Sequence, residues 1–465
     1  MRSLANYDFA ANIHLYRYKE LNILLDVNSG AIHILDDLAC QLVEAIIAQQ
    51  GNVEKARNDV TSKNPGYAED EIDRLIQELE AAMEAESLFT EGQVLEVNLS
   101  NLHIKAICLN VAHACNMKCR YCFAGQGEFG RPPALMSLAT ARQALDFLLE
   151  QSGAIQNLEV DFFGGEPLLV LPMLQELLPY ARQREEETGK KFSFTLTTNA
   201  LLLDDEVIDF VIANEIGVIL SLDGRKEVND RHRILNNGAG SYDLILPRIK
   251  KMVERNPVSY YVRGTFSRQN LDFARDLEHL VELGFDCVSL EPAVGPENGF
   301  AIQESDLPQV LEEYERLTEL LLNYHRQGRH IHFFHYNLNL QKGPCLAKRS
   351  TGCGAGIEYL VITPEGDIYP CHQFVGEDDF YMGNLQKGQV DRKIRSKFES
   401  NQLKNKDCKH CWVRYFCGGG CHAQAYRQHG KISIPHYPSC AMHMKRIEGA
   451  IYLDLRKDMD NRQNF

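Results

Sequence analysis

Six short apolar runs alternate with helical patterns in the central part of the chain. The runs cover residues 105–111, 158–163, 192–197, 217–222, 259–265 and 286–290. Segments between them, for instance 139–150, 206–213 and 271–283, carry apolar residues at helical spacing. Because repeated strand–helix units place their strands in parallel, this pattern predicts an α/β fold. We expect a partial (β/α)6 TIM-like barrel with its chemistry at the carboxyl ends of the strands.

A separate α+β unit is predicted before the barrel, over residues 12–91. Its segment 13–19 has the pattern of a strand, and 21–35 forms two apolar arms around the turn Asn28-Ser29-Gly30. Helical patterns follow, and the last of them is rich in acidic residues. The order of strand, hairpin and three helices is typical of a winged-helix-like domain. A cap that only stabilises the N-terminus is the alternative interpretation.

Composition and charge narrow the classes of function. The chain has 49 basic and 64 acidic residues, a net charge of −15, which argues against a nucleic-acid partner. No apolar run approaches the roughly 18 residues that a membrane span needs. Asp8 stands where an export signal would have its apolar core. We therefore expect a cytoplasmic protein with neither a nucleic-acid nor a membrane partner.

The 14 cysteines are placed very unevenly. Three lie within eight residues after the first predicted strand, and eight lie between Cys345 and Cys440. Clustered thiols in a reducing compartment are better metal ligands than disulfide partners. The isolated Cys40, Cys108 and Cys287 have apolar neighbours and are expected to be buried core residues. The region 345–445 is poor in long periodic segments and cannot bury enough apolar surface alone. Bound metal is therefore expected to stabilise its fold.

Cys115, Cys119 and Cys122 follow directly on the first predicted barrel strand, at the catalytic mouth of such a barrel. Three thiolates can hold three irons of a four-iron cubane and leave the fourth iron open to a small molecule. The alternative is a zinc ion held by the same three thiolates and His113.

This Cys-x3-Cys-x2-Cys loop, with Tyr121 before its last cysteine, resembles the signature of the radical S-adenosylmethionine (SAM) superfamily. The resemblance implies a 4Fe–4S cluster on Cys115, Cys119 and Cys122 whose open iron binds SAM. Reduction would then cleave SAM to a 5′-deoxyadenosyl radical that takes hydrogen from a substrate. An external one-electron reductant is implied as a partner.

Further motifs at the ends of the next strands fit the SAM site of that superfamily. The resemblance implies these SAM-binding residues: Tyr121, Gly164, Gly165, Glu166, Thr198, Asn199, Ser221, Asp223 and Arg263. The glycine pair can also be an ordinary turn, and Arg263 can also be a structural ion-pair residue. The loop after Ser221-Leu-Asp223-Gly224 departs from the pattern, because Arg225 and Asn229 replace the usual Pro and His.

The later cysteines resemble the SPASM domain, an appendage of radical SAM enzymes that act on peptides and proteins. Cys353 is followed by twelve residues, Gly366, four residues and Cys371, and an array from Cys408 to Cys440 completes the spacing. The resemblance implies two auxiliary 4Fe–4S clusters and three clusters in all. Cys345, Cys353, Cys371 and Cys421 would hold the first auxiliary cluster, and Cys408, Cys411, Cys417 and Cys440 the second.

Alternatives remain for this array. Cys345 is a natural eighth ligand, but an open iron would leave it spare or exchangeable. Two zinc ribbons built on Cys-x2-Cys pairs are the alternative metal site. The histidines that adjoin the cysteines, His372, His410 and His422, are expected to be solvated surface residues.

Three further stretches stand out: Leu-Leu-Asp-Val-Asn-Ser-Gly at 24–30, Arg-Gly-Thr-Phe at 263–266, and the run from Gly352-Cys-Gly-Ala-Gly to Pro370-Cys-His-Gln-Phe-Val. With them, the whole chain resembles maturases of cysteine-rich ribosomal peptides, of the ranthipeptide and six-cysteine-peptide (SCIFF) type. Three domains follow from this: 1–95 for leader-peptide recognition, 96–330 for the radical SAM barrel and 331–465 for the SPASM domain. The implied activity is a peptide thioether synthase that joins cysteine sulfur to carbon within a Cys-rich precursor, whose leader binds residues 12–91. The alternatives are a maturase of sulfatases or of amine-dehydrogenase subunits, and an iron–sulfur electron-transfer or binding protein.

Overall fold

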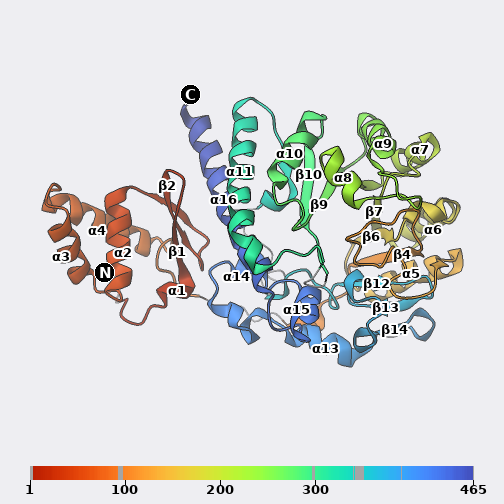
Figure 1. Cartoon of the computed structure of the whole chain (residues 1–465). Helices are drawn as coiled ribbons and strands as arrows, with labels where there is room; N and C mark the ends of the chain where they lie inside the picture. Colours follow the sequence, from red (N-terminus) through yellow and green to blue (C-terminus); the bar gives the residue numbers. More distant parts are fainter. Residues whose placement is uncertain are drawn as a thin grey trace.

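The computed structural model describes residues 4–92, 98–295, 299–338, 340, 350–388 and 390–463. An N-terminal domain projects from a larger body that holds the barrel and the C-terminal segment (Figure 1). Within the described residues, no helix combines the length and the apolar character needed to cross a membrane.

The N-terminal domain is a three-stranded antiparallel sheet followed by three helices. A short helix α1 (Phe9–Asn12) leads into the sheet, whose order is β1-β2-β3. The strands are β1 (Ile13–Tyr18), β2 (Leu21–Asp26) and β3 (Ile32–Leu35), and the helices are α2 (Asp37–Ala48), α3 (Val53–Lys63) and α4 (Glu69–Glu84). Gly30 at φ +78° permits the predicted turn between β2 and β3. This element order agrees with the sequence-based expectation.

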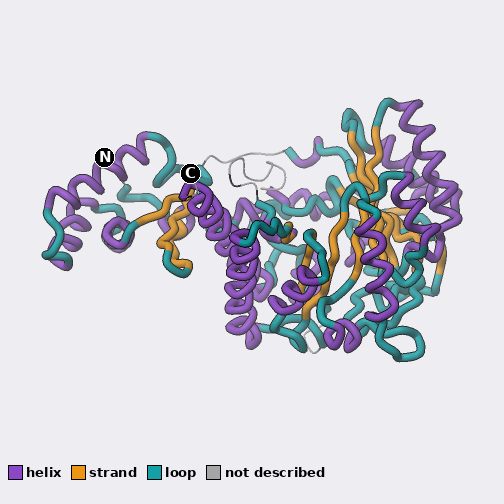
Figure 2. The backbone as a smooth tube through the Cα atoms, turned by 90° about the horizontal axis from the view of Figure 1, so that it is seen from above, coloured by secondary structure: helices purple, strands orange, loops and turns teal. Residues whose placement is uncertain are grey.

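Six parallel strands form the barrel in the order predicted. They are β4 (Ala106–His113), β6 (Asn157–Gly164), β7 (Lys191–Thr198), β8 (Gly217–Ser221), β9 (Tyr260–Phe266) and β10 (Cys287–Pro292). The helices between and after them are α5 (Leu138–Gln151), α6 (Leu171–Thr188), α7 (Asp205–Ala213), α8 (Lys226–His232), α9 (Tyr242–Glu254), α10 (Phe273–Glu282) and α11 (Leu307–Arg326). Figure 2 shows the helices packed around the strands of the sheet.

Alternation along β6 explains how the barrel separates its two faces. Leu158, Val160 and Phe162 are fully buried in the core under the helices. Asp161 and Phe163, which alternate with them, line the central cavity instead. The same strand therefore supplies core packing on one face and cavity side chains on the other.

The C-terminal segment continues the barrel sheet, which the sequence pattern did not predict. Strand β12 (Tyr359–Ile362) pairs in parallel with β4, and β13 (Asp367–Tyr369) and β14 (Gly383–Asn384) extend the sheet in antiparallel fashion. Two two-residue strands complete it: β5 (Ala134–Leu135) beside β4 and β11 (His332–Phe333) beside β10. Helices α13 (Arg392–Ser400), α14 (Arg414–Cys417), α15 (His422–His429) and α16 (Tyr437–Gln463) follow. Helix α16 packs along α11 (Figure 1).

The N-terminal domain docks on the loop that carries Cys411 and Cys417. Arg414, only 5% exposed, donates from Nη2 to Asn12 Oδ1 (2.9 Å) and Asn28 Oδ1 (2.7 Å), and from Nη1 to the Ala11 carbonyl. Trp412 lies flat on the His14 ring, with centroids 3.6 Å apart. One buried cation and one aromatic stack therefore fix this domain to the cysteine-rich segment.

Candidate active site

One cavity of about 840 Å³ joins the barrel to the cysteine-rich segment. Its wall contains Cys115, Cys119 and Cys122 from the loop after β4. It also contains five cysteines of the C-terminal array: Cys353, Cys371, Cys417, Cys421 and Cys440. Cysteines from sequence regions more than two hundred residues apart therefore face a common space.

The loop after β4 rests on a backbone cradle made by glycines. A Cβ on Gly165 would lie 2.1 Å from the Ala114 carbonyl oxygen, and one on Gly127 would lie 2.6 Å from Gly165 Cα. Gly164 has φ +126°, a conformation that other residues rarely adopt. The glycine pair predicted to bind SAM therefore has a geometric reason to be glycine: it lets this loop approach the end of β6 closely.

We expect Gly165→Ala to lower SAM affinity about 100-fold, because the added methyl group must push the cysteine loop off β6. Calorimetric titration of the anaerobically reconstituted protein with SAM measures this. Gly66→Ala is the matched control, since nothing lies within 4 Å of its added Cβ. Equal affinities for the two variants would contradict the role of the cradle.

Glu166 organises the turn after β7 and is itself fully buried. Its carboxylate accepts hydrogen bonds from Thr198 Oγ1 (2.8 Å), the Asn199 amide (2.8 Å) and the Leu168 amide (3.1 Å). Asn199 in turn places its Nδ2 3.7 Å from Cys115 Sγ. Thr198 and Asn199 line the cavity, and the hydrogen bonds of Glu166 position the turn that carries them.

Tyr121, Asp223 and Arg233 form a buried group beside the cysteine loop. The Tyr121 hydroxyl donates to the Asp223 carboxylate at 2.7 Å and accepts from Arg233 Nη1 at 3.1 Å. Thr265 N also donates to Asp223 (3.0 Å), and burial raises the pKa of Asp223 to about 6. Asp223 is 1% exposed and outside the cavity wall, whereas Tyr121 and Arg233 line it. Asp223 therefore holds the other two residues in place.

Arg233 is the cavity residue that the sequence interpretation missed. It is 7% exposed, faces the cavity and has a buried Nε atom without a hydrogen-bond partner. An orphaned guanidinium N–H beside a cavity is suited to an anionic ligand group such as a carboxylate. Nothing in the local sequence Arg231-His232-Arg233 distinguishes this arginine, because the distinction comes from its burial.

The residues present therefore fit SAM and a cluster with an open iron. Seven of the nine predicted SAM-binding residues line the cavity, namely Tyr121, Gly164, Gly165, Thr198, Asn199, Ser221 and Arg263. Burial raises the pKa of the Cys115 thiol to about 12, so this thiol stays protonated until a cationic centre binds it. Arg263 interacts electrostatically with Glu291 and His335.

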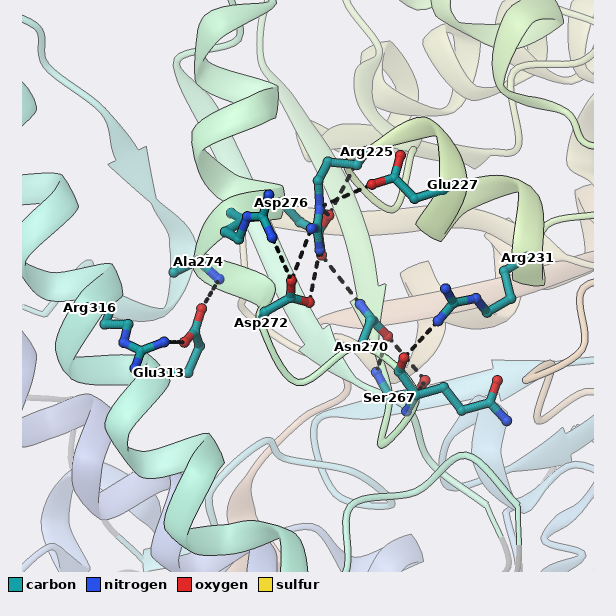
Figure 3. A network of polar contacts seen from close by, with 12 residues as sticks. Arg225, Glu227, Arg231, Ser267, Asn270, Asp272, Ala274, Asp276, Glu313 and Arg316 are labelled. Atoms are coloured by element: carbon teal, nitrogen blue, oxygen red, sulfur yellow. Dashed lines mark hydrogen bonds and ion pairs between the residues drawn. The ribbon is translucent and has the colours of Figure 1, made fainter.

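The departure at Arg225 has a structural explanation (Figure 3). The Arg225 guanidinium pairs with both carboxylate oxygens of Asp272 (2.9 Å each) and with Asp276 (2.8 Å). Asn229 Oδ1 accepts from the Asp223 amide at 3.4 Å, and its Nδ2 donates to Ser241 Oγ at 3.1 Å. Arg225 thus ties the loop after β8 to helix α10, and Asn229 contacts the Asp223 backbone. These contacts position Asp223 without the usual Pro and His.

Electrostatic interactions link the thiols of the later cysteines in two sets. Burial raises the pKa of the Cys440 thiol to about 12, and the neighbouring thiols of Cys417, Cys408 and Cys411 add to the rise. The pKa of Cys371 is raised by burial and then by Cys353 and Cys421. Cys345 lies outside the described residues. Within the described part of the chain, every cysteine is a free thiol.

The expectation of solvated histidines beside these cysteines is wrong for two of the three. His410 is exposed, but His422 is 3% exposed and His372 lines the cavity. Burial lowers the pKa of His372 to about 4 and that of His422 to about 3. Lys406, also buried, donates to the Gly419 carbonyl at 3.1 Å and interacts with thiols of both groups. Helix packing that the local sequence does not encode buries these side chains.

The zinc alternative receives no support from His113. This histidine is fully buried, its ring lies 5.0 Å from the Phe129 ring, and its Nδ1 lies 4.0 Å from Glu365. Among the described residues, no group of three or more His, Cys, Asp or Glu side chains could hold a single metal ion. Of the isolated cysteines, Cys108 is buried as expected, whereas Cys40 and Cys287 are only partly buried.

Comparison with known proteins agrees with this geometry. Residues 109–283 match the radical SAM superfamily, and residues 353–412 match SPASM, an iron–sulfur cluster-binding domain. The chain is 28% identical over 329 residues to mycofactocin maturase MftC of Mycobacterium ulcerans, covering 69% of this chain and 84% of that protein. It is 25% identical over 338 residues to a cysteine-type anaerobic sulfatase-maturating enzyme of Clostridium novyi, covering 66% and 84%.

Solved structures share the fold. The structure of anSMEcpe with bound AdoMet superposes with a TM-score of 0.65 at 18% identity, over 76% of this chain and 95% of that chain. SuiB of Streptococcus suis, bound to S-adenosylmethionine, gives a TM-score of 0.54 at 16% identity, over 94% of this chain and all of that chain (100%). These structures show the shared fold, and the two domain matches show that the chain contains a radical SAM domain followed by an iron–sulfur cluster-binding SPASM domain.

Proposed function

We propose that this protein is a radical SAM maturase that forms thioether crosslinks, from cysteine sulfur to carbon, in a Cys-rich precursor peptide. The observation that carries the proposal is the single cavity lined by both cysteine regions. When bound, SAM and the clusters supply one-electron chemistry that removes a hydrogen atom from an unreactive C–H bond and accepts an electron. A peptide segment in this cavity has the three-cysteine loop on one side and Cys353, Cys371 and Cys421 on another.

Residues of the cavity supply the SAM site in this proposal. Tyr121, Gly164, Gly165, Thr198, Asn199, Ser221 and Arg263 would contact SAM, and Arg233 adds a buried cation for its carboxylate. Glu166 and Asp223 would hold these contacts in place. The cluster assignment stays as the sequence predicts, with Cys345 as the eighth auxiliary ligand.

The N-terminal domain supports a peptide as the substrate. A second cavity, of about 410 Å³, lies between β3 and α4 and is lined by Ile34, Leu75, Glu78 and Leu79 among others. β3 is the last strand in the order β1-β2-β3, so among the described residues its outer edge has no strand partner. An open edge beside an apolar groove is suited to a peptide that adds a strand. We assign this groove to the leader of the precursor.

We expect Leu75→Ser to weaken binding of the leader about 10-fold, because a polar side chain replaces an apolar wall of the groove. Fluorescence anisotropy of a labelled leader peptide measures the affinity. Asp70→Asn is the control on the same helix, since Asp70 is exposed and pairs only with Arg74 at the surface. Equal weakening by both variants would show that the loss is not specific to the apolar wall and would contradict the groove.

The test of the proposed function is anaerobic reconstitution with SAM, a reductant and a Cys-rich candidate precursor peptide. The expected product lacks two hydrogen atoms per crosslink, and its crosslinked cysteines resist alkylation. The relative from C. novyi gives the second candidate, oxidation to formylglycine, which would yield an aldehyde that reacts with hydrazides. Cofactor cleavage with an unmodified peptide would contradict the thioether assignment.

A further inference from the structure

A carboxylate that the SAM site does not use lies deeper in the same cavity. Asp161 is three residues before Gly164 on β6, toward the amino end of the strand. In the register of the sheet it stands between Cys108 of β4 and Thr195 of β7. All three side chains line the cavity, so they form one layer of the barrel interior.

The surroundings of Asp161 leave it without a cation. It accepts one hydrogen bond, from Thr195 Oγ1, and makes no ion pair with any described residue. The groups that face it are Thr195 from β7, Glu159 from its own strand, Cys108 from β4 and, next to Cys108, Tyr359 from β12. Burial raises the pKa of Asp161, and Glu159 adds to the rise. Asp161 is partly buried in the cavity wall, and a desolvated carboxylate without an ion pair costs stability, so its presence in a cavity points to a chemical use.

We propose that Asp161 is the general base that accepts the proton released by the substrate residue in this cavity. The proposal rests on the proposed function: crosslinking removes one hydrogen atom, one electron and one proton from the peptide. A C–H bond of the acceptor residue breaks and a C–S bond forms in its place, and SAM and the clusters, when bound, would supply the chemistry that accepts the hydrogen atom and the electron. The thiol S–H bond breaks, its electron pair stays on sulfur, and the proton forms a new O–H bond on the Asp161 carboxylate. Product release then exposes the acid to water, which takes the proton.

The other acids at the cavity are less suited to this task. Glu291 lies 3.1 Å from His335 Nε2, and the electrostatic pull of His335 contributes to a pKa lowered to about 2, despite the opposing effect of burial. A carboxylate so acidic is a weak base toward a thiol. Glu166 and Asp223 are occupied by the donors described above, and burial raises the pKa of Cys108 well above neutrality. Asp161 therefore combines access, a raised pKa and a free oxygen.

The test uses the reconstituted enzyme with its precursor peptide, SAM and a reductant. We expect D161N to modify the peptide at least about 100-fold more slowly, while its SAM binding and peptide affinity stay within about threefold of wild type. E159Q, on the same strand and nearer its exposed end, is the matched control and keeps the wild-type rate. A D161N variant that is fully active, or one that has lost SAM binding as well, would overturn the proposal.

The pH profile separates a base from a structural residue. The wild-type rate should fall on the acid side as Asp161 becomes protonated, and D161N should lack this acid limb. T195V removes the hydrogen bond that favours the carboxylate, so its acid limb should move to higher pH. E159Q should move it slightly to lower pH. An acid limb that is identical in all four proteins contradicts the assignment.

Infrared difference titration needs no turnover and remains decisive if the thioether proposal fails. The carboxylic-acid band that disappears in D161N should persist above the ordinary titration range of aspartate, about pH 4. A band that is lost by that pH would overturn the inference. If the wild type makes a different two-hydrogen oxidation product, the proposed function fails, but the comparison of D161N with E159Q still tests the base.

Discussion

Cys119→Ala will reduce SAM cleavage below about one-thousandth of the wild-type rate, a barrier increase of about 4 kcal/mol or more. Cys119 lines the cavity with Cys115 and Cys122, and burial raises the pKa of its thiol, so a bound cationic centre is needed to hold it as a thiolate at neutral pH. The loop has three cysteines, and the proposed cluster needs all of them as ligands. The loss of one thiolate would therefore prevent the loop from holding a cluster with an open iron. Production of 5′-deoxyadenosine by the dithionite-reduced protein measures the effect.

Two further variants make this result specific. Cys40→Ala removes a partly exposed thiol in the N-terminal domain and should leave SAM cleavage unchanged. Cys411→Ala, in the second auxiliary group, should retain SAM cleavage but lose modification of the peptide. If Cys119→Ala still cleaves SAM at a comparable rate, the assignment of the loop is wrong.

Arg414→Met will lower the free energy of unfolding at the N-terminal interface by about 3 kcal/mol. The substitution leaves the Ala11 carbonyl and the side chains of Asn12 and Asn28 without their buried donor. Trp412 is the only tryptophan in the chain and stacks on His14 at this interface. Its fluorescence during urea denaturation therefore reports directly on undocking of the N-terminal domain.

Arg74→Met is the control for this prediction. Arg74 is exposed on α4 and pairs with Asp70 at the surface, so its loss should cost less than about 1 kcal/mol. We also expect Arg414→Met to impair peptide modification more than SAM cleavage, because the leader groove would no longer be fixed relative to the barrel. An unchanged Trp412 transition would show that the buried guanidinium contributes little.

The barrel strands could be predicted from the sequence because they are short apolar runs between helical patterns. Their side chains alternate between the core under the helices and the central cavity. All six predicted strands agree with the structure within a few residues at each end, and their parallel order is confirmed. The three-cysteine loop and the glycine pair line one cavity, as their positions after strands implied, and five of the later cysteines line it as well. These features depend on the spacing of residues that are close in the chain, and this spacing can be read from a single sequence.

Contacts between distant segments could not be predicted from the sequence pattern. Strand β12 adds to β4 from a segment about 250 residues later, and no periodicity within residues 359–362 announces that pairing. His422 was predicted to be solvated but is buried, and its local sequence gives no sign of this. Arg233 is likewise distinguished from other basic residues only by its burial. The hydrogen bonds by which Glu166 and Asp223 hold Thr198 and Tyr121 also come from elements remote in sequence.

By itself, then, the sequence determined which residues form strands, where the glycines and cysteines recur and which chemistry they suit. The tertiary structure alone decided which side chains share a cavity, which carboxylates are occupied by donors, and that Asp161 has no ion pair with any described residue. The physical reason is that strand alternation and ligand spacing are local properties of the chain. Burial and electrostatic environment are instead set by side chains that arrive from remote elements.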